Sequence, residues 1–422
     1  MLRDLRVDAV DIAINLPHSD HLFLLIGSNP LPNAVAGRLL GTQGGTITLI
    51  HSENSFQVAQ RLQSWLIRQR FPNVRLKEVG ESHPVSIAEN VRAELQAINA
   101  RHVGLHYTGG TKAMSVHAYR AVDQWVQGKG VKPVFSYLDA RRLQMEFDPA
   151  DPFSGEPGQG TYIGRAVELT LTDLLELHGW TLQHFPTAHP LLPVSARALA
   201  MACEREDAFK VWKQWIHDEL RAKCRRPDKD EWKTKTALKS IVLHLSEHNS
   251  LDSVARSIHS ELNQAAGSVT LEHPVFDNNT QHFCEWLDGK WLEHYVLDAL
   301  NSQAAHLKLH QCVQNIETAE VQFDVDVIGL RGYQLFAFSC STDTGKSLLK
   351  SKLFEAYIRA RQLGGDEARV ALVCCSADPE GLEHEMRCDV DPEGRIHVFG
   401  RKHLAYFTTH LSQWIQSQSG EE

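Results

Sequence analysis

No apolar run in this sequence is long enough to cross a membrane, because Asp, Arg, His or Lys interrupts every candidate. The amino-terminal stretch also lacks the apolar core of a secretory signal peptide. It is charged instead, at Arg3, Asp4, Arg6, Asp8 and Asp11. Both absences argue against a membrane or secreted protein, and we expect a cytoplasmic one.

Motifs that bind structural metals are missing as well. The eight cysteines form no Cys-x-x-Cys pair, and the 23 histidines form no His-Glu-x-x-His. Scattered cysteines of this kind are typical of reduced thiols in a core. The net charge of -9 argues against a protein that coats nucleic acid over its whole surface. Any contact with nucleic acid must therefore come from a local basic patch.

The composition is that of a globular protein, with 42% apolar and 23% charged residues, and 422 residues are enough for two or three domains. In the first third, short apolar runs alternate with segments of helical spacing, which predicts a Rossmann-like parallel sheet. The predicted strands are 22–27, 46–50, 74–79, 102–107, 131–138 and 143–147. The predicted helices are 34–40, 54–70, 87–98 and the segment after residue 112. In such sheets, ligands bind at the carboxyl ends of the strands.

One loop of this predicted sheet runs from Thr108 to Lys112 with the sequence TGGTK. It is not a P-loop, because Gly110 stands where a lysine is required, and the chain has no G-x-G-x-x-G fingerprint here. A strand-to-helix loop nevertheless directs backbone N–H groups and the positive end of a helix dipole at one point. The glycines let the backbone approach a ligand, and Lys112 adds a positive charge. We expect phosphate binding; the alternative is that the glycines only form a turn.

Two motifs of this region together resemble the CARF domain of type III CRISPR ancillary proteins. They are the loop Gly27-Ser28-Asn29-Pro30 and the Thr-Gly-Gly-Thr-Lys-x-Met motif that begins at Thr108. The resemblance implies a homodimer whose paired loops bind a cyclic oligoadenylate second messenger across a two-fold axis. The implied ligand-binding residues are Ser28, Asn29, Pro30, His51, Ser52, Thr108, Gly109, Gly110, Thr111 and Lys112. For Ser28 and Asn29 the alternative is a plain turn with an Asx hydrogen bond.

The middle of the chain begins with residues 148–163, which are rich in Pro, Gly and Asp and predict a loop. The predicted elements that follow are a strand at 167–171, a helix at 173–178 capped by Thr172 and ended by Gly179, and three helices at 196–224, 232–248 and 253–266. The basic turn from Arg221 to Lys229 fits either a winged-helix module that reads DNA or a spacer between two functional parts. Acidic residues dilute its charge, which favours the spacer.

The last third predicts an αββαβ order: a helix beginning near Gly289, strands 321–328 and 335–341, helix 346–363 and strand 370–375. A strand at 395–399 and a helix at 403–416 follow. This order, with Glu293 on the helix and Asp326 on the first strand, resembles the PD-(D/E)XK nuclease core. The Gly-x-Trp-Leu-Glu-x-Tyr-Val helix resembles, in particular, the effector domains of CARF-fused nucleases. The resemblance implies a Mg²⁺ or Mn²⁺ ion held by Glu293, Asp324 and Asp326.

The chain departs from the nuclease pattern at the end of the second strand, where Glu-x-Lys is replaced by Ser339-Cys340-Ser341. Either the domain has lost catalysis or the charges have moved to the next helix. Lys352 and Glu355 lie on one face of that helix, and we assign them to the catalytic set with Glu293 and Asp326. The alternative is a solvated surface pair, which such spacing usually gives.

The sequence therefore predicts an α/β protein with a Rossmann-like CARF sensor (1–158), a helical, winged-helix-like linker (159–275) and a restriction-endonuclease-like domain (276–422). Its predicted function is that of a cyclic-oligoadenylate-activated, metal-dependent endonuclease acting on DNA or RNA in type III CRISPR antiviral defence. We expect a homodimer without membrane contact. Two alternatives stay open: a non-catalytic sensor with a degenerate nuclease domain, and a ring nuclease that degrades its own messenger.

Overall fold

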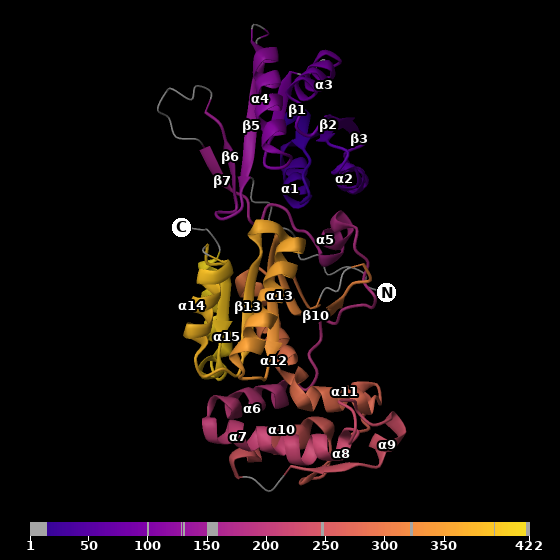
Figure 1. Ribbon diagram of the computed structural model, residues 1–422, viewed down its shortest axis with the longest axis vertical. Coiled ribbons are helices and arrows are strands. Elements are labelled where there is room, and N and C mark those ends of the chain that lie inside the picture. The colour runs from indigo at the N-terminus through magenta and orange to yellow at the C-terminus, as the bar shows by residue number, and fades with distance from the viewer. Residues whose placement is uncertain are drawn as a thin grey trace. The chain divides into compact units, whose positions relative to one another are not determined.

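The computed structural model describes residues 15–98, 101–127, 129, 131–149, 159–245, 249–320, 324–391 and 393–418 (Figure 1). The chain forms two compact units. The first is Met1–Thr181 with Leu363–Glu367 and Ser419–Glu422, and the second is Leu182–Gln362 with Ala368–Gln418. Seven strands form the sheet of the first unit and five form the main sheet of the second. Among the described residues, no helix is both long and apolar enough to span a membrane.

The sheet of the first unit has the strand order β3-β2-β1-β4-β5-β6-β7. Its strands are β1 (Ser19–Leu25), β2 (Gly41–His51), β3 (Asn73–Glu78), β4 (His102–His106), β5 (Lys132–Asp139), β6 (Gln144–Phe147) and β7 (Gln159–Tyr162). The connecting helices are α1 (Leu31–Leu40), α2 (Phe56–Arg68), α3 (Pro84–Gln96) and α4 (Lys112–Val126). Strands β1 to β5 pair in parallel, and β6 and β7 add antiparallel strands. The strand order reverses between β1 and β4, which makes this a topological switch point.

Apolar runs in the central strands explain this architecture, because a parallel sheet between helices is buried on both faces. Phe23, Leu25 and Leu105 share one core cluster with residues of α3 and α4, such as Val91 and Met114. The predicted Rossmann-like sheet is confirmed.

The segment before α5 (Leu171–His178) differs from the prediction. No strand forms at 167–171; Val167 and Leu169 are buried, but they pack as a loop. The helix cap is Thr170 and not Thr172, because the Thr170 hydroxyl accepts a hydrogen bond from the backbone N–H of Asp173, whose carboxylate accepts one from Thr170 N at 2.9 Å. Gly179 ends the helix as predicted, with a φ of 74°.

The main sheet of the second unit has the order β10-β11-β12-β13-β14, antiparallel from β10 to β12 and parallel from β12 to β14. Its strands are β10 (Gln311–Glu317), β11 (Asp324–Arg331), β12 (Gln334–Ser341), β13 (Arg369–Cys374) and β14 (Ile396–Phe399). Its helices are α12 (Trp291–Leu307), α13 (Lys346–Gly364), α14 (Pro379–Val390) and α15 (Phe407–Ser417). The predicted αββαβ order is present. The sequence did not indicate β10 or α14.

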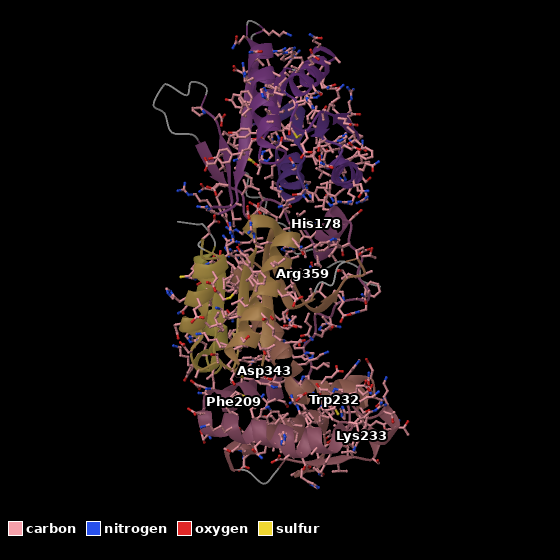
Figure 2. The ribbon with its side chains drawn as sticks, in the orientation of Figure 1. His178, Phe209, Trp232, Lys233, Asp343 and Arg359 are labelled. Carbon is pink, nitrogen blue, oxygen red and sulfur yellow. The ribbon has the colours of Figure 1, made fainter. Side chains whose placement is uncertain are left out.

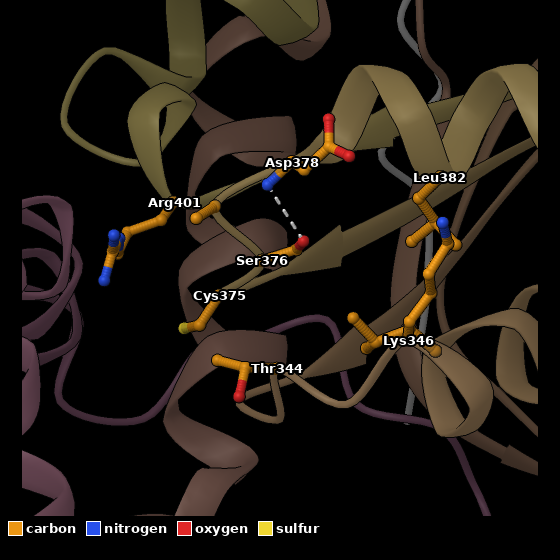
Figure 3. A pocket seen from close by; sticks show the side chains of 9 residues that line it. Thr344, Lys346, Cys375, Ser376, Asp378, Leu382 and Arg401 are labelled. Atoms are coloured by element: carbon orange, nitrogen blue, oxygen red, sulfur yellow. Dashed lines mark hydrogen bonds between the residues drawn. The ribbon is translucent and has the colours of Figure 1, made fainter.

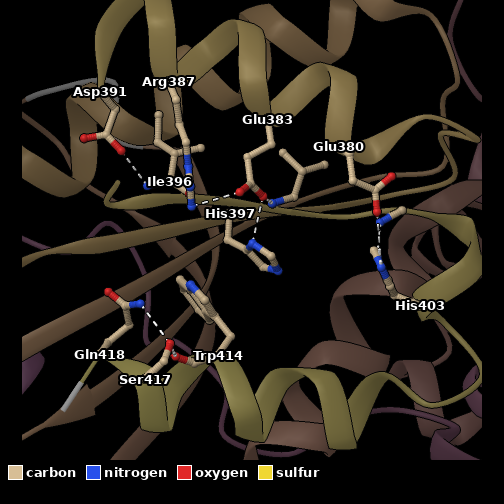
Figure 4. Close-up of polar contacts among 12 residues, drawn as sticks. Glu380, Glu383, Arg387, Asp391, Ile396, His397, His403, Trp414, Ser417 and Gln418 are labelled. Carbon is tan, nitrogen blue, oxygen red and sulfur yellow. Dashed lines mark hydrogen bonds and ion pairs between the residues drawn. The ribbon is translucent and has the colours of Figure 1, made fainter. Parts of the chain in front are cut away.

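Polar contacts join α14 to β14 (Figure 4), and ring stacking joins β14 to α15. His397 Nδ1 lies 2.7 Å from a carboxylate oxygen of Glu383, and Arg387 pairs with the other at 2.8 Å. His397 also stacks on Trp414, with ring centroids 5.7 Å apart. Burial alone would raise the pKa of Glu383, but the hydrogen bond from His397 and the nearby cations hold it below its usual value. The network therefore ties the edge strand to both helices.

Residues 182–276 form a helical module within the second unit. Its elements are α6 (Pro193–Glu204), α7 (Glu206–Trp215), the π turn Ile216–Arg221, α8 (Ala222–Cys224), α9 (Lys235–Lys239), β8 (Val242–His244), the 3₁₀ turn Asn249–Leu251, α10 (Asp252–Leu262), β9 (Ser268–Thr270) and the 3₁₀ turn Pro274–Phe276. The predicted helix at 232–248 is wrong, since α9 stops at Lys239 and the chain then pairs as β8 with β9. The sequence left a winged-helix module and a spacer open for this segment and favoured the spacer. The structure shows helices beside a two-stranded antiparallel sheet.

The helical module has no core separate from the main sheet. Trp212 and Trp215 of α7 belong to the same buried cluster as Leu292 of α12 and Phe336 and Phe338 of β12. Arg401, which follows β14, lies over the ring of Phe209 of α7, with its guanidinium carbon 5.5 Å from the ring centroid. Figure 2 labels Phe209. The module and the main sheet therefore bury one continuous core, and the boundary between the two units falls at Thr181, inside the predicted 159–275 segment.

Candidate functional sites

The first candidate site lies at the switch point of the first unit, where the loops after β1 and β4 meet. These loops pack backbone against backbone. A Cβ atom on Gly27 would lie 3.0 Å from the backbone N of Gly110, and one on Gly109 would lie 2.2 Å from the carbonyl oxygen of Leu25. Gly110 itself has a φ of +74°. The fold therefore requires these glycines, whether or not a ligand binds.

Several of the predicted ligand-binding residues shape these loops through internal hydrogen bonds. Asn29 Oδ1 accepts from Leu31 N at 3.0 Å, the Asx turn that the sequence left open, and Pro30 is buried at the start of α1. Thr111 is the N-cap of α4 and accepts from Met114 N at 3.2 Å. Thr108 Oγ1 accepts from Leu138 N at 2.6 Å.

His51 is the last residue of β2 and Ser52 follows it, at the same edge of the sheet as the two loops. Both residues are buried. His51 Nδ1 lies 3.0 Å from the carbonyl oxygen of Ser52, and Ser52 N donates to Ser55 Oγ at 3.0 Å. In this position they support the loop edge from the neighbouring strand.

Ser28, Thr108 and Lys112 are exposed polar residues of the two central loops. Lys112 is the first residue of α4, a helix of 15 residues. In the part of the chain that the structure describes, no ion pair is recorded for its ammonium group. The helix dipole and this ammonium are positive charges at one place, so the edge can accept an anion.

The second candidate site lies where β11 and β12 diverge. Their ladder runs from Arg331 and Gln334 to Val327 and Phe338, whereas β12 continues beside β13 to Ser341. The carboxylate of Asp326 accepts a hydrogen bond from the backbone N of Cys340 at 2.6 Å. The side chain of Asp326 therefore replaces the missing strand partner, and this contact fixes the carboxylate at the end of the sheet.

The charges of three predicted catalytic residues from three elements act on the thiol of Cys340, and one of the three, Asp326, also bonds its backbone N. Burial raises the pKa of the Cys340 thiol well above its usual value, and the negative charges of Asp326 and Glu293 raise it further. The positive charge of Lys352 acts in the opposite direction. Glu293 comes from α12, Asp326 from β11 and Lys352 from α13, so the fold brings together residues that are far apart in the sequence.

The remaining predicted residues are placed differently. Glu355 is exposed, and its carboxylate lies 4.0 Å from Arg359 of the same helix. The surface pair that the sequence left as an alternative was between Glu355 and Lys352. Asp324 opens β11, but its side chain lies outside the described residues. Ser339 and Ser341 are buried, and Ser341 Oγ accepts from Asp343 N at 3.3 Å, so the substituted motif forms part of the strand end.

Sequence reasoning missed one charged residue of this site, Lys290. It ends the kinked turn Trp286–Lys290 that precedes α12. Burial alone would lower the pKa of Lys290, but the carboxylates of Glu285, Glu293 and Asp326 together raise it above its usual value. The visible signal was its position three residues before Glu293, one helical turn away.

The donor set at this site consists of carboxylates. Among the described residues, no three His, Cys, Asp or Glu side chains come close enough to enclose a metal ion by themselves. Two carboxylates beside positive groups still suit a hard cation that completes its shell with water and phosphate oxygens, as Mg²⁺ commonly does. The residues present therefore fit such an ion as partial ligands.

A cavity of about 290 Å³ opens on the same edge of the sheet (Figure 3). Its lining comes from the segments that follow β12, β13 and β14: Thr344, Lys346, Ser376, Asp378 and Arg401 among others. Because β11 runs antiparallel to β12, the first residues of β11 lie at this edge too. Carboxylates, cations and a cavity thus share one end of the sheet.

The architecture defines the chain as an α/β protein with a Rossmann-like first unit and a restriction-endonuclease-like second unit. No protein-family model and no curated protein matches the sequence. Solved structures share the fold, and two of them are described here. Protein VC1899 from Vibrio cholerae has a TM-score of 0.69 at 15% identity, over 95% of this chain and 100% of its own. Can2 from Sulfobacillus thermosulfidooxidans, in complex with cyclic tetra-adenylate, has a TM-score of 0.65 at 15% identity, over 94% and 97%. The likeness confirms the predicted fold class.

Proposed function

We propose that this protein is a nuclease that a cyclic oligoadenylate activates and that uses a divalent metal ion. The observation that carries the proposal is the carboxylate of Asp326, held by the backbone N of Cys340 at 2.6 Å, at a strand end where the charges of Glu293 and Lys352 also act. If these residues only covered the surface, there would be no reason for charges from α12, β11 and α13 to act on the same strand end. The shared fold with Can2, whose structure holds cyclic tetra-adenylate, supports the choice of messenger.

In the proposed reaction, a water oxygen forms a bond to phosphorus, the bond to the leaving sugar oxygen breaks, and that oxygen takes up a proton. One water is consumed for each phosphodiester cut. When bound, a Mg²⁺ or Mn²⁺ ion supplies water activation and charge neutralisation. Asp326 and Glu293, with Asp324, would hold it. Lys352 adds a positive charge near the phosphate, and the backbone hydrogen bond keeps Asp326 in place.

The loops of the first unit would bind the messenger. A cyclic oligoadenylate is a ring of phosphates, and a helix N-terminus with an adjacent ammonium attracts such groups. Two copies of the loop edge, related by a two-fold axis, match the symmetry of the ring, which is why we propose a homodimer. The messenger would activate only by binding the cutting arrangement more tightly than the resting one.

The test is cleavage by the purified full-length protein with Mn²⁺, with and without cyclic tetra-adenylate. We expect plasmid DNA or single-stranded nucleic acid to be cut only when the messenger is present. Asp326→Ala should abolish cutting, by roughly a hundredfold or more, because it removes a metal ligand. Messenger affinity should stay unchanged. Full cleavage by Asp326→Ala would remove the assigned site.

A non-catalytic sensor remains the second candidate, because Ser339 and Ser341 are buried where Glu-x-Lys stands in active nucleases. The two candidates differ in metal binding. A nuclease should be stabilised by Mn²⁺ in a thermal shift that Glu293→Gln abolishes, whereas an inert domain should show no such shift. Loss of the messenger itself on incubation would instead favour a ring nuclease.

A further inference from the structure

The kinked turn Trp286–Lys290 lies between the helical module and the second site. The helix is interrupted at Gly289, whose backbone angles are non-helical, with φ 170° and ψ -24°. Glu285 precedes the kink and Lys290 follows it. Their side chains pair at 3.1 Å. Trp286 and Trp291, on either side of the turn, are almost fully buried, so the turn is anchored in the core.

Two contacts fix this turn from opposite sides. On one side, Asp288 accepts hydrogen bonds from Arg221 Nε and Arg225 Nη2, each at 2.8 Å, and its side chain is only 13% exposed. On the other side, a Cβ on Gly289 would lie 3.2 Å from Thr342 Oγ1, so the backbone of the turn packs on the residue that follows β12. We name the Arg221–Asp288–Arg225 contacts the Asp288 clamp.

Lys290 follows these two fixed residues directly. Its ammonium interacts electrostatically with Glu293, one turn along α12, and with Asp326 of β11. These are the two carboxylates whose charges act on Cys340. The chain therefore has a cation beside its acidic pair in spite of the substituted Glu-x-Lys motif.

We propose that Lys290 contributes the positive charge that the lost Glu-x-Lys lysine would supply, and that the Asp288 clamp positions it. This inference rests on the proposed nuclease function. Lys290 would neutralise negative charge on the scissile phosphate as the water oxygen attacks. No proton moves to or from Lys290 in this role. Asp288 is a positioning residue, because it acts only through the turn.

The experiment compares variants of the full-length protein with Mn²⁺ and cyclic tetra-adenylate. Lys290→Ala should lower kcat by roughly a hundredfold, as losing one electrostatic stabiliser of a transition state does. Lys290→Arg should keep at least about a tenth of wild-type kcat, because the charge stays. The matched control is Lys239→Ala, which breaks a similarly exposed pair with Glu272 outside the site and should change nothing.

A second readout is Mn²⁺ affinity, measured by calorimetry without substrate. Removal of a cation beside Glu293 and Asp326 should leave this affinity unchanged or increase it. A damaged fold would decrease it. Asp288→Asn should lower kcat about tenfold with an unchanged melting temperature. Its control, Asp298→Asn, breaks another helix-to-α12 pair, with Arg197 at 3.0 Å, and should keep full activity.

The outcomes separate the two proposals. If the wild type cuts and Asp326→Ala does not, a Lys290→Ala variant within twofold of wild type overturns the role of Lys290 alone. An equal loss in Lys290→Arg, or weaker Mn²⁺ binding in Lys290→Ala, overturns it too. Full activity of Asp288→Asn overturns the clamp. A wild type that never cuts with messenger and Mn²⁺ removes the nuclease function and this inference with it.

Discussion

At the scale of single residues, burial sets the protonation state of titratable side chains. His106 of β4 is fully buried beside Ser136, with its Nδ1 3.1 Å from the hydroxyl. Burial lowers the pKa of His106 to about 3. A neutral imidazole is thus part of the folded state at every pH at which the protein would work.

This burial predicts a loss of stability in mild acid. Below a pH of about 6.5 the unfolded chain protonates His106 and the folded chain does not, so stability is complete above that pH and falls as pH decreases. The slope for one such residue approaches about 1.4 kcal/mol per pH unit. Calorimetric unfolding between about pH 5 and pH 7 should show a shallower slope for His106→Gln than for wild type. The exposed His102→Gln is the control. Equal slopes in wild type and His106→Gln would contradict the prediction.

The sequence indicated Glu293 and Asp326 through the resemblance of their helix and strand to the PD-(D/E)XK core, and Lys352 through its place on the following helix. It did not indicate Lys290, because the kink at Gly289 that precedes this lysine has no clear signal in the sequence pattern. Glu355 shows the converse limit. Its spacing from Lys352 suggested a shared face, yet it lies exposed beside Arg359.

At the scale of elements, long apolar strands and their connecting helices were predictable from periodicity, whereas short elements with distant partners were not. The segment 232–248 has helical spacing, but β8 forms there because β9, from another part of the chain, pairs with it. The strand predicted at 167–171 failed for a similar reason. Its alternating apolar residues are buried by tertiary packing without a strand partner.

The cap of α5 gives a prediction in which the structure and the sequence differ. Thr170→Ala should destabilise the first unit by about 1 kcal/mol, because it removes the capping box with Asp173. Thr172→Ala, at the cap position that the sequence suggested, is exposed inside the helix and should leave stability unchanged or slightly increase it. Thermal unfolding of the two variants measures the difference. A larger loss in Thr172→Ala would contradict the cap seen in the structure.

At the scale of the whole molecule, the proposed two-fold arrangement predicts a stoichiometry. One messenger ring should bind per two chains, because a symmetric ring of phosphates is matched by two opposed helix N-termini. Titration calorimetry with cyclic tetra-adenylate, together with mass measurement in solution, tests this. One ring bound per monomeric chain would contradict the dimer and leave messenger binding itself intact.

The shared core of the second unit limits how the chain can be divided. The sequence predicts residues 159–275 as a helical linker. In the structure, Trp212 and Trp215 lie in the core cluster that also contains residues of α12 and β12. A shortened chain starting at residue 276 would expose those apolar faces of α12 and β12 to water, and we expect it to aggregate. Recombination between related genes meets the same restriction, because the helical module and the main sheet could be exchanged only together.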